Sequence, residues 1–129
     1  MEAAKAKGCY KELHNFFNGL GSDKFPDFMK NRFDIAFGVN VFAPGHIPFG
    51  GFDDAYESLK VGGHFVTSYR KFLDVPGEPS GYRDTLDRLE KAGKYKRLYE
   101  STHKRGQAGY EVKQWSEMEF NIVVYQKIA

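Results

Sequence analysis

The stretch that decides the fold is Arg32–Phe42, which reads RFDIAFGVNVF and is a nearly continuous apolar run. Such a run is typical of a β-strand that is covered on both faces, as in a parallel sheet. The segment Ala43–Pro48 (APGHIP) follows at once, and its two prolines and one glycine end the strand. We therefore predict an inner strand over residues 32–42, with a loop at its carboxyl end.

The chain on either side of this run shows further helices and strands. Apolar residues recur with helical spacing at Phe52, Ala55, Tyr56 and Leu59, and again at Tyr82, Leu86 and Leu89. Glycines that follow each pattern, Gly62–Gly63 and Gly93, are expected to end these helices. Aromatic and β-branched residues predict strands over His64–Tyr69, Tyr95–Ser101 and Phe120–Gln126, with a hairpin connection at Gln107–Tyr110. At the amino end, a short helix is predicted over Glu2–Lys7 and a short strand over Tyr10–Phe17.

The order of these elements is α, β, β, α, β, α, β, β. Alternating strands and helices predict an α/β fold with a mainly parallel sheet that is covered on two sides. The last two strands have no helix between them, so one strand is expected to be antiparallel. The 129 residues fit a single domain, 1–129.

The composition excludes several classes of protein. Hydrophobic residues make up 41% of the chain, so disorder is not expected, and a net charge of +2 does not indicate a nucleic-acid or membrane partner. With Cys9 as the single cysteine and no metal-ligand spacing among the four histidines, neither an internal disulfide nor a metal site is expected. No secretory signal or membrane span is apparent, and a soluble, cytoplasmic protein is expected. The basic cluster Lys91–Arg105 could bind single-stranded nucleic acid, but the acidic residues that follow favour a solvated face.

Five short motifs occur in an order that resembles a known family. They are Phe33–Ala36 (FDIA), Leu59–Phe65 (LKVGGHF), the Ala-Gly step that ends Tyr82–Gly93, Pro44–Ile47 (PGHI), and Lys7–Tyr10 (KGCY) followed by Leu13. Together they resemble the class I S-adenosylmethionine-dependent methyltransferases, and among these the methyltransferase-like protein 27 (Williams–Beuren region) family. The resemblance covers the carboxyl-terminal part of that domain. It implies a partial Rossmann-like sheet that lacks strands 1 and 2 of the family order 3-2-1-4-5-7-6.

The resemblance also implies a cofactor and site residues. S-adenosylmethionine is the family's cofactor, and Phe17, Gly38 and Val39 occupy positions that face it in a complete relative. His46 lies in the loop beyond the strand, where it would act as a general base or merely fill a turn. The family's glycine-rich loop and the acidic residue after its second strand do not occur in this sequence. The resemblance therefore implies a methyltransferase-like chain that is inactive in isolation.

The alternative is a non-catalytic interaction subunit, a pseudoenzyme built on a degenerate methyltransferase fold. Without strands 1 and 2, the strand Phe33–Phe42 would lie at the edge of the sheet, where a long apolar strand favours aggregation. We therefore expect this edge to be covered by a protein partner, by a second copy of the chain, or by the strand Tyr10–Phe17. Asp34 begins the strand, away from the site, and is interpreted as structural.

Overall fold

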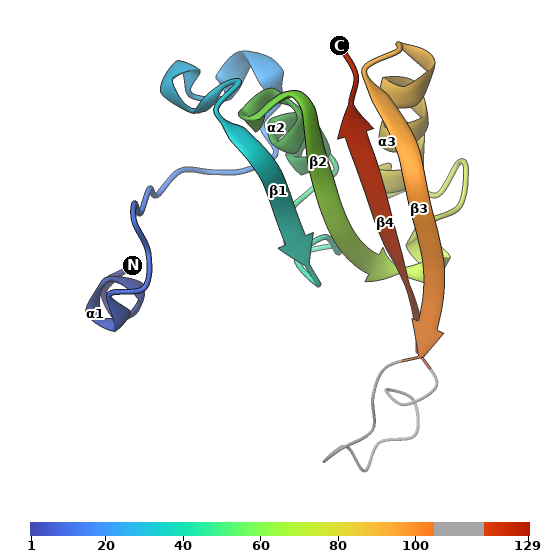
Figure 1. Ribbon diagram of the computed structural model, residues 1–129. Helices are drawn as coiled ribbons and strands as arrows, with labels where there is room; N and C mark the ends of the chain where they lie inside the picture. The colour runs from blue at the N-terminus through green and yellow to red at the C-terminus, as the bar shows by residue number, and fades with distance from the viewer. Residues whose placement is uncertain (105–117) are drawn as a thin grey trace.

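The computed structural model describes residues 1–104 and 118–129 (Figure 1). Its helices are α1 (Glu2–Lys7), α2 (Gly50–Ser58) and α3 (Tyr82–Lys91), with short 3-10 turns η1 (Ser22–Lys24), η2 (Asp27–Met29) and η3 (Lys71–Leu73). Its strands are β1 (Phe33–Val39), β2 (Leu59–Arg70), β3 (Tyr95–Lys104) and β4 (Glu119–Lys127). The helices and strands predicted from Glu2–Lys7 and from residue 32 onward are confirmed. The predicted connection Gln107–Tyr110 lies outside the described residues, as does Arg105 of the basic cluster.

The described strands form one sheet in the order β1-β2-β4-β3. β1 pairs in parallel with β2, whereas β4 pairs antiparallel with both β2 and β3. The sheet is therefore mixed, and the expectation of a mainly parallel sheet is wrong. β4 alone runs against the other described strands, but it lies inside the sheet, so its single reversal makes two of the pairings antiparallel.

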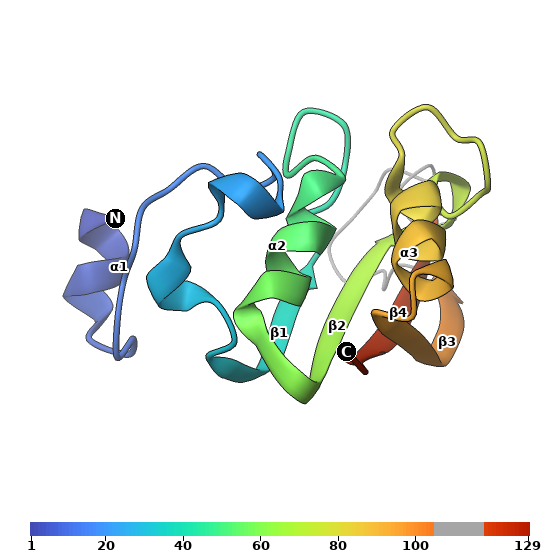
Figure 2. The same cartoon turned by 90° about the horizontal axis from the view of Figure 1, so that it is seen from above.

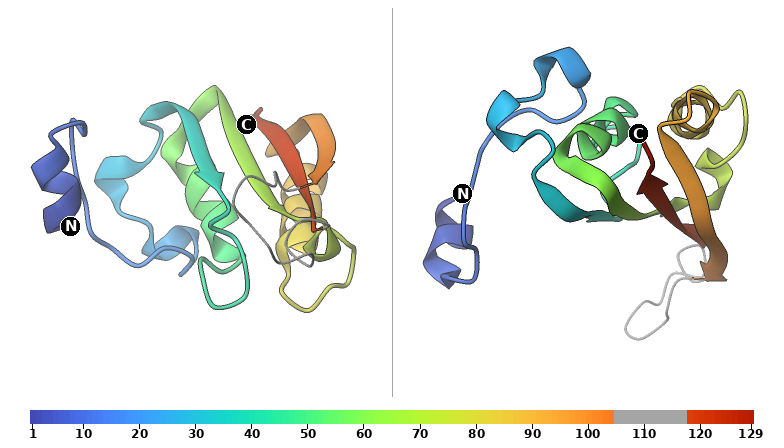
Figure 3. Two further views of the ribbon diagram at one scale, coloured as in Figure 1. Left: turned by 90° about the horizontal axis from the view of Figure 1, so that it is seen from below. Right: turned by 45° about the horizontal axis from the view of Figure 1, so that its top comes forward.

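Helices α2 and α3 pack on the same face of the sheet, as Figure 2 shows. Within residues 1–104 and 118–129, the opposite face carries no helix (Figure 3). This arrangement contradicts the expectation of a sheet covered on two sides. No helix in the described ranges is long and apolar enough to cross a membrane.

β1 is consequently a half-covered edge strand. Ala36 pairs with the buried Phe65, whereas Phe37 pairs with Val66, so Phe37 and its alternate neighbours Ile35 and Val39 face the open side. Ile35, Phe37 and Val39 are 62%, 78% and 57% exposed there. The prediction of a doubly covered inner strand over residues 32–42 is wrong. An apolar run shows that both faces of a strand carry apolar side chains, but it does not show whether another layer packs on each face.

The amino-terminal segment does not form the predicted strand. Residues 10–17 are irregular, and they contact the rest of the chain through side chains. Glu12 forms an ion pair with Arg32, and the ring of Phe16 meets that of Phe25 at 5.8 Å in an edge-to-face contact. The strand prediction for Tyr10–Phe17 is therefore wrong, and this segment does not pair with the edge of β1.

The core lies between the sheet and its two helices. Phe52 of α2 is fully buried and its ring lies 5.7 Å from that of Phe65 and 5.5 Å from that of Tyr82. Leu86 and Leu89 of α3 are also fully buried, which confirms the helical face predicted from their spacing. Burial of each large side chain contributes about 1.5–3 kcal/mol, so this cluster holds both helices on the sheet.

A buried carboxylate links four elements at one end of this core. Asp74, which follows η3, accepts a hydrogen bond from the Tyr69 hydroxyl at 2.6 Å and one from Asn121 Nδ2 at 2.8 Å. The guanidinium groups of Arg83 and Arg97 lie 3.4 and 3.7 Å from the same carboxylate. A buried charge needs such partners, because an unpaired one is strongly destabilising. Strands β2, β3 and β4 and helix α3 thus meet at Asp74.

Two buried tyrosines provide a matched test of this network. The Tyr95 hydroxyl is buried and has no hydrogen-bond partner within the described part of the chain, unlike that of Tyr69. Tyr69→Phe is expected to lower the free energy of unfolding by about 1–3 kcal/mol, because Asp74 loses a donor. Tyr95→Phe is expected to leave it unchanged or raise it, because an unsatisfied hydroxyl is removed. Urea denaturation followed by circular dichroism measures both, and an equal loss in the two variants would contradict the assignment.

Candidate functional site

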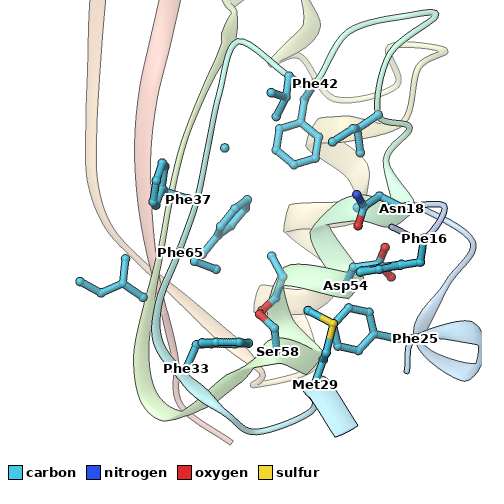
Figure 4. A pocket seen from close by; sticks show the side chains of 17 residues that line it. Phe16, Asn18, Phe25, Met29, Phe33, Phe37, Phe42, Asp54, Ser58 and Phe65 are labelled. Atoms are coloured by element: carbon cyan, nitrogen blue, oxygen red, sulfur yellow. The ribbon is translucent and has the colours of Figure 1, made fainter. Parts of the chain in front are cut away.

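A cavity of about 360 Å³ lies between β1, α2 and the amino-terminal segment (Figure 4). Its wall is mainly apolar and includes the side chains of Phe16, Phe25, Phe33, Phe42 and Phe65. The backbone of β1 borders it from residue 33 to residue 38, at the edge of the sheet where no further described strand pairs. Its volume lies in the range of small-molecule sites, which are also predominantly apolar.

Asp54 supplies the charged group at this cavity. It lies on α2, is 6% exposed, and its Oδ2 accepts a hydrogen bond from the backbone N–H of Gly19 at 2.6 Å. Burial raises the pKa of its carboxyl above the usual range, and the Gly19 hydrogen bond opposes that shift. Asn18 and Ser58 add the neighbouring polar side chains, and the Ser58 hydroxyl donates to Ala55 O at 2.8 Å. The carboxylate therefore anchors the amino-terminal segment to α2.

Glycines allow the close packing at this end of α2. A Cβ on Gly51 would lie 2.5 Å from Ile47 Cγ2 and 2.8 Å from Phe42 Cε1. A Cβ on Gly38 would similarly lie 2.9 Å from Val41 Cγ2. Because real Cβ atoms do not approach so closely, only glycine lets the loop after β1 fold back onto the helix. The two glycines thereby hold Phe42 in the cavity wall.

The predicted site residues lie in different environments. Gly38 borders the cavity, and its carbonyl accepts a hydrogen bond from Thr67 Oγ1 at 2.7 Å. Phe17 is 70% exposed and does not line the cavity, whereas its neighbour Phe16 does. Val39 faces the open side of the sheet. His46 is exposed in the loop before α2, and its backbone N–H donates to Ala43 O. The structure thus brings one of the four predicted positions to the cavity.

Sequence reasoning missed Asp54. The spacing of Phe52, Ala55 and Tyr56 predicts the buried face of α2, and Asp54 lies between them as an ordinary helical acid. Its burial depends on the amino-terminal segment, which lies over α2 and brings Gly19 within hydrogen-bonding distance. Nothing in the local pattern signals that contact, because it joins residues 35 positions apart.

The cavity does not fit S-adenosylmethionine. That cofactor carries a carboxylate, an ammonium, two ribose hydroxyls and a sulfonium, each of which needs a partner when buried. Asp54 and Ser58 already hydrogen-bond within the chain, Asn18 is the remaining polar side chain of the wall, and its other residues are apolar or glycine. In residues 1–104 and 118–129, no group of three acidic, histidine or cysteine residues could hold a metal ion.

Two residues of the basic cluster, Lys94 and Arg97, make contacts within the chain. Arg97 turns inward, donates to the Tyr125 hydroxyl at 2.6 Å and forms an ion pair with Glu100. The Lys94 ammonium lies 5.3 Å from the centre of the Tyr56 ring.

Comparisons with known proteins place the fold but not the activity. No protein-family model matches the chain, and no curated protein matches it in sequence. The structure is similar to the crystal structure of the PH0226 protein from Pyrococcus horikoshii OT3, with a TM-score of 0.51 and 15% identity over 98% of this chain and 64% of that one. A 30S ribosomal A1408 methyltransferase from an uncultured bacterium (UncKam) gives a TM-score of 0.45 and 10% identity, over 84% of this chain and 61% of that one. The chain thus spans less than two thirds of either protein. The first likeness shows a shared fold alone, and the second is too weak to add to it.

Asp54 can be tested through the segment that it anchors. Asp54→Ala is expected to raise amide hydrogen exchange at Gly19 by about tenfold or more, because a hydrogen bond to a charged group contributes about 1.5–3 kcal/mol. Asp54→Asn is the matched control, since its amide oxygen can still accept from Gly19. Exchange measured by mass spectrometry distinguishes them. Unchanged protection in Asp54→Ala would show that other contacts hold this segment.

Proposed function

We propose that the chain is a methyltransferase-like protein of the class I S-adenosylmethionine-dependent group that neither binds this cofactor nor transfers methyl groups as an isolated chain. The observation that carries the proposal is the strand order β1-β2-β4-β3 with β4 reversed. The family order 3-2-1-4-5-7-6 ends in a block 4-5-7-6. β1, β2, β4 and β3 correspond to strands four, five, seven and six of that block.

The resembling motifs occupy matching places in this order. Phe33–Ala36 begins β1, and Gly62–Gly63 lies in β2 where the pairing with β1 shifts register. Ala92–Gly93 joins α3 to β3, with Gly93 at a φ of 70°, a left-handed conformation that favours glycine. Helices α2 and α3 connect the strands that the corresponding helices connect in the family. Motif positions and topology thus support the same assignment independently.

The proposal of inactivity rests on the contacts that the cofactor needs. A glycine-rich loop brings backbone N–H groups to the cofactor, and a carboxylate accepts from its ribose hydroxyls. The sequence contains no loop of this type, and by the resemblance Phe16–Phe17 stand where many relatives carry a Gly-Asp pair whose aspartate faces the adenine. The aromatic wall of the cavity offers no substitute for these polar contacts.

The second candidate is a non-catalytic interaction subunit, and the open face of β1 favours it. Ile35, Phe37 and Val39 form an exposed apolar row on an edge strand. Apolar residues concentrated on one strand edge are typical of a surface that pairs with another chain. The two candidates are compatible, because a fold that has lost cofactor contacts can keep a role in assembly.

Titration calorimetry with S-adenosylmethionine tests the proposal. The purified chain is expected to give no saturable heat with S-adenosylmethionine or with S-adenosylhomocysteine, because its cavity lacks the required polar partners. A complete class I methyltransferase, titrated under the same conditions, is the positive control. Saturable binding in the micromolar range that Gly38→Val abolishes would overturn the proposed inactivity and place the cofactor beside β1.

A further inference from the structure

The cavity beside α2 carries polar side chains on one wall only. These side chains, Asn18, Asp54 and Ser58, come from the amino-terminal segment and from α2. β1 and β2 contribute apolar side chains and one glycine. Figure 4 shows Phe33 and Phe65 on the side of the sheet and Asp54 on the side of the helix. A ligand that matches both walls has an apolar body and one polar end.

Within the described part of the chain, Asp54 is a buried carboxylate without a counter-charge. It is 6% exposed, and its hydrogen-bond donor is the backbone N–H of Gly19, a neutral group that does not balance the charge. No lysine, arginine or histidine is among the described residues that line the cavity. The neighbouring Asp53, in contrast, forms an ion pair with Arg88 at 2.7 Å. Because a buried charge without a partner is destabilising, Asp54 favours a cation in the cavity.

The charges near Asp54 also favour a cation over an anion. Burial raises the pKa of the Asp54 carboxyl, and repulsion from Asp53 and Glu57 of the same helix raises it further. Two basic residues just before β1, Lys30 and Arg32, form ion pairs with other carboxylates and do not serve Asp54. A positive group that enters from outside would therefore be attracted to this wall, and a negative one would be repelled.

We propose that this cavity binds a small apolar amine, whose ammonium pairs with Asp54 and whose hydrocarbon body packs against Phe33 and Phe65. An ammonium donates to a carboxylate in a charge-assisted hydrogen bond, which is stronger than one between neutral groups. The volume of about 360 Å³ suits a ligand with a single aromatic ring, since an apolar cavity of roughly 150 Å³ already holds benzene. The inference does not rest on the proposed function, because it requires none of the contacts that S-adenosylmethionine needs.

Probes of the same shape and different charge test the proposal. At neutral pH 2-phenylethylamine is a cation, 2-phenylethanol is neutral and phenylacetate is an anion. Each is titrated into the isotope-labelled chain, and the shifts of amide resonances in NMR spectra measure its affinity and report where it binds. The amine is expected to bind about tenfold or more tightly than the alcohol and to shift the resonance of Gly19, because a hydrogen bond to a charged group is the stronger one. Phenylacetate is expected not to bind.

Two neighbouring substitutions separate the charge of Asp54 from the shape of the cavity. Asp54→Asn keeps an oxygen that can accept from Gly19 but removes the charge, so the amine is expected to fall to the affinity of the alcohol. Asp53→Asn is the matched control, because it removes the same charge from a residue that pairs with Arg88 and does not line the cavity. This control is expected to keep the preference for the amine. Binding of the alcohol checks that the cavity is intact in both variants.

The comparison of the amine with the alcohol on the unchanged chain does not depend on the folding of either variant. Equal affinity of that chain for these two probes overturns the proposal, as does the failure of every probe to bind. A preference for the amine that persists in Asp54→Asn, or that both variants lose equally, also overturns it.

Discussion

The structure depends on the packing of Phe52 against the covered face of the sheet. This side chain of α2 is fully buried among the rings of Phe42, Phe65, Tyr69 and Tyr82. It therefore joins the loop after β1, strand β2 and helix α3 in one contact cluster. Truncating such a residue costs about 3–5 kcal/mol, which is a large part of the stability of a small domain.

In the part of the chain that the structure describes, this packing covers one face of the sheet and leaves the other open. The hydrogen bonds of Asp74 and the packed aromatic rings lie on the face of the sheet that α2 and α3 cover. On the other side, β1 keeps a row of apolar residues and a free edge. The cavity beside Asp54 lies at the same edge. Its aromatic wall, and not a set of polar ligands, is what this chain offers there.

The strand order is the observation that carries the proposed methyltransferase-like assignment, and it is more specific than any single motif. Each motif is short, but the placement of β4 between β2 and β3 requires a reversed final strand inserted into the sheet. The fold shared with the PH0226 protein extends over nearly all of this chain. Fold does not specify activity, because chemistry depends on particular groups at a site. The proposed function therefore rests on which cofactor contacts the chain can make.

Local pattern was sufficient for much of the fold. The spacing of Tyr82, Leu86 and Leu89 predicted α3 and its buried face, and the apolar segments predicted β1 to β4. It failed at Tyr10–Phe17, where side-chain contacts such as the ion pair of Glu12 with Arg32 replace strand pairing. Of the candidate site, the resemblance named Gly38 as a position that faces the cofactor, a role that stays a prediction, and the sequence contained no signal for Asp54, whose burial depends on Gly19.

From residue 32 onward, the sequence by itself determined where the described helices and strands form, because periodicity and turn residues act over a few neighbours. Only the tertiary structure decided which faces are covered. The sequence pattern of β1 is the same whether a helix, a second strand or water contacts its apolar side chains. What contacts them depends on layers contributed by distant parts of the chain. For that reason Phe37, which the sequence suggests is buried inside a sheet, lies exposed at its edge.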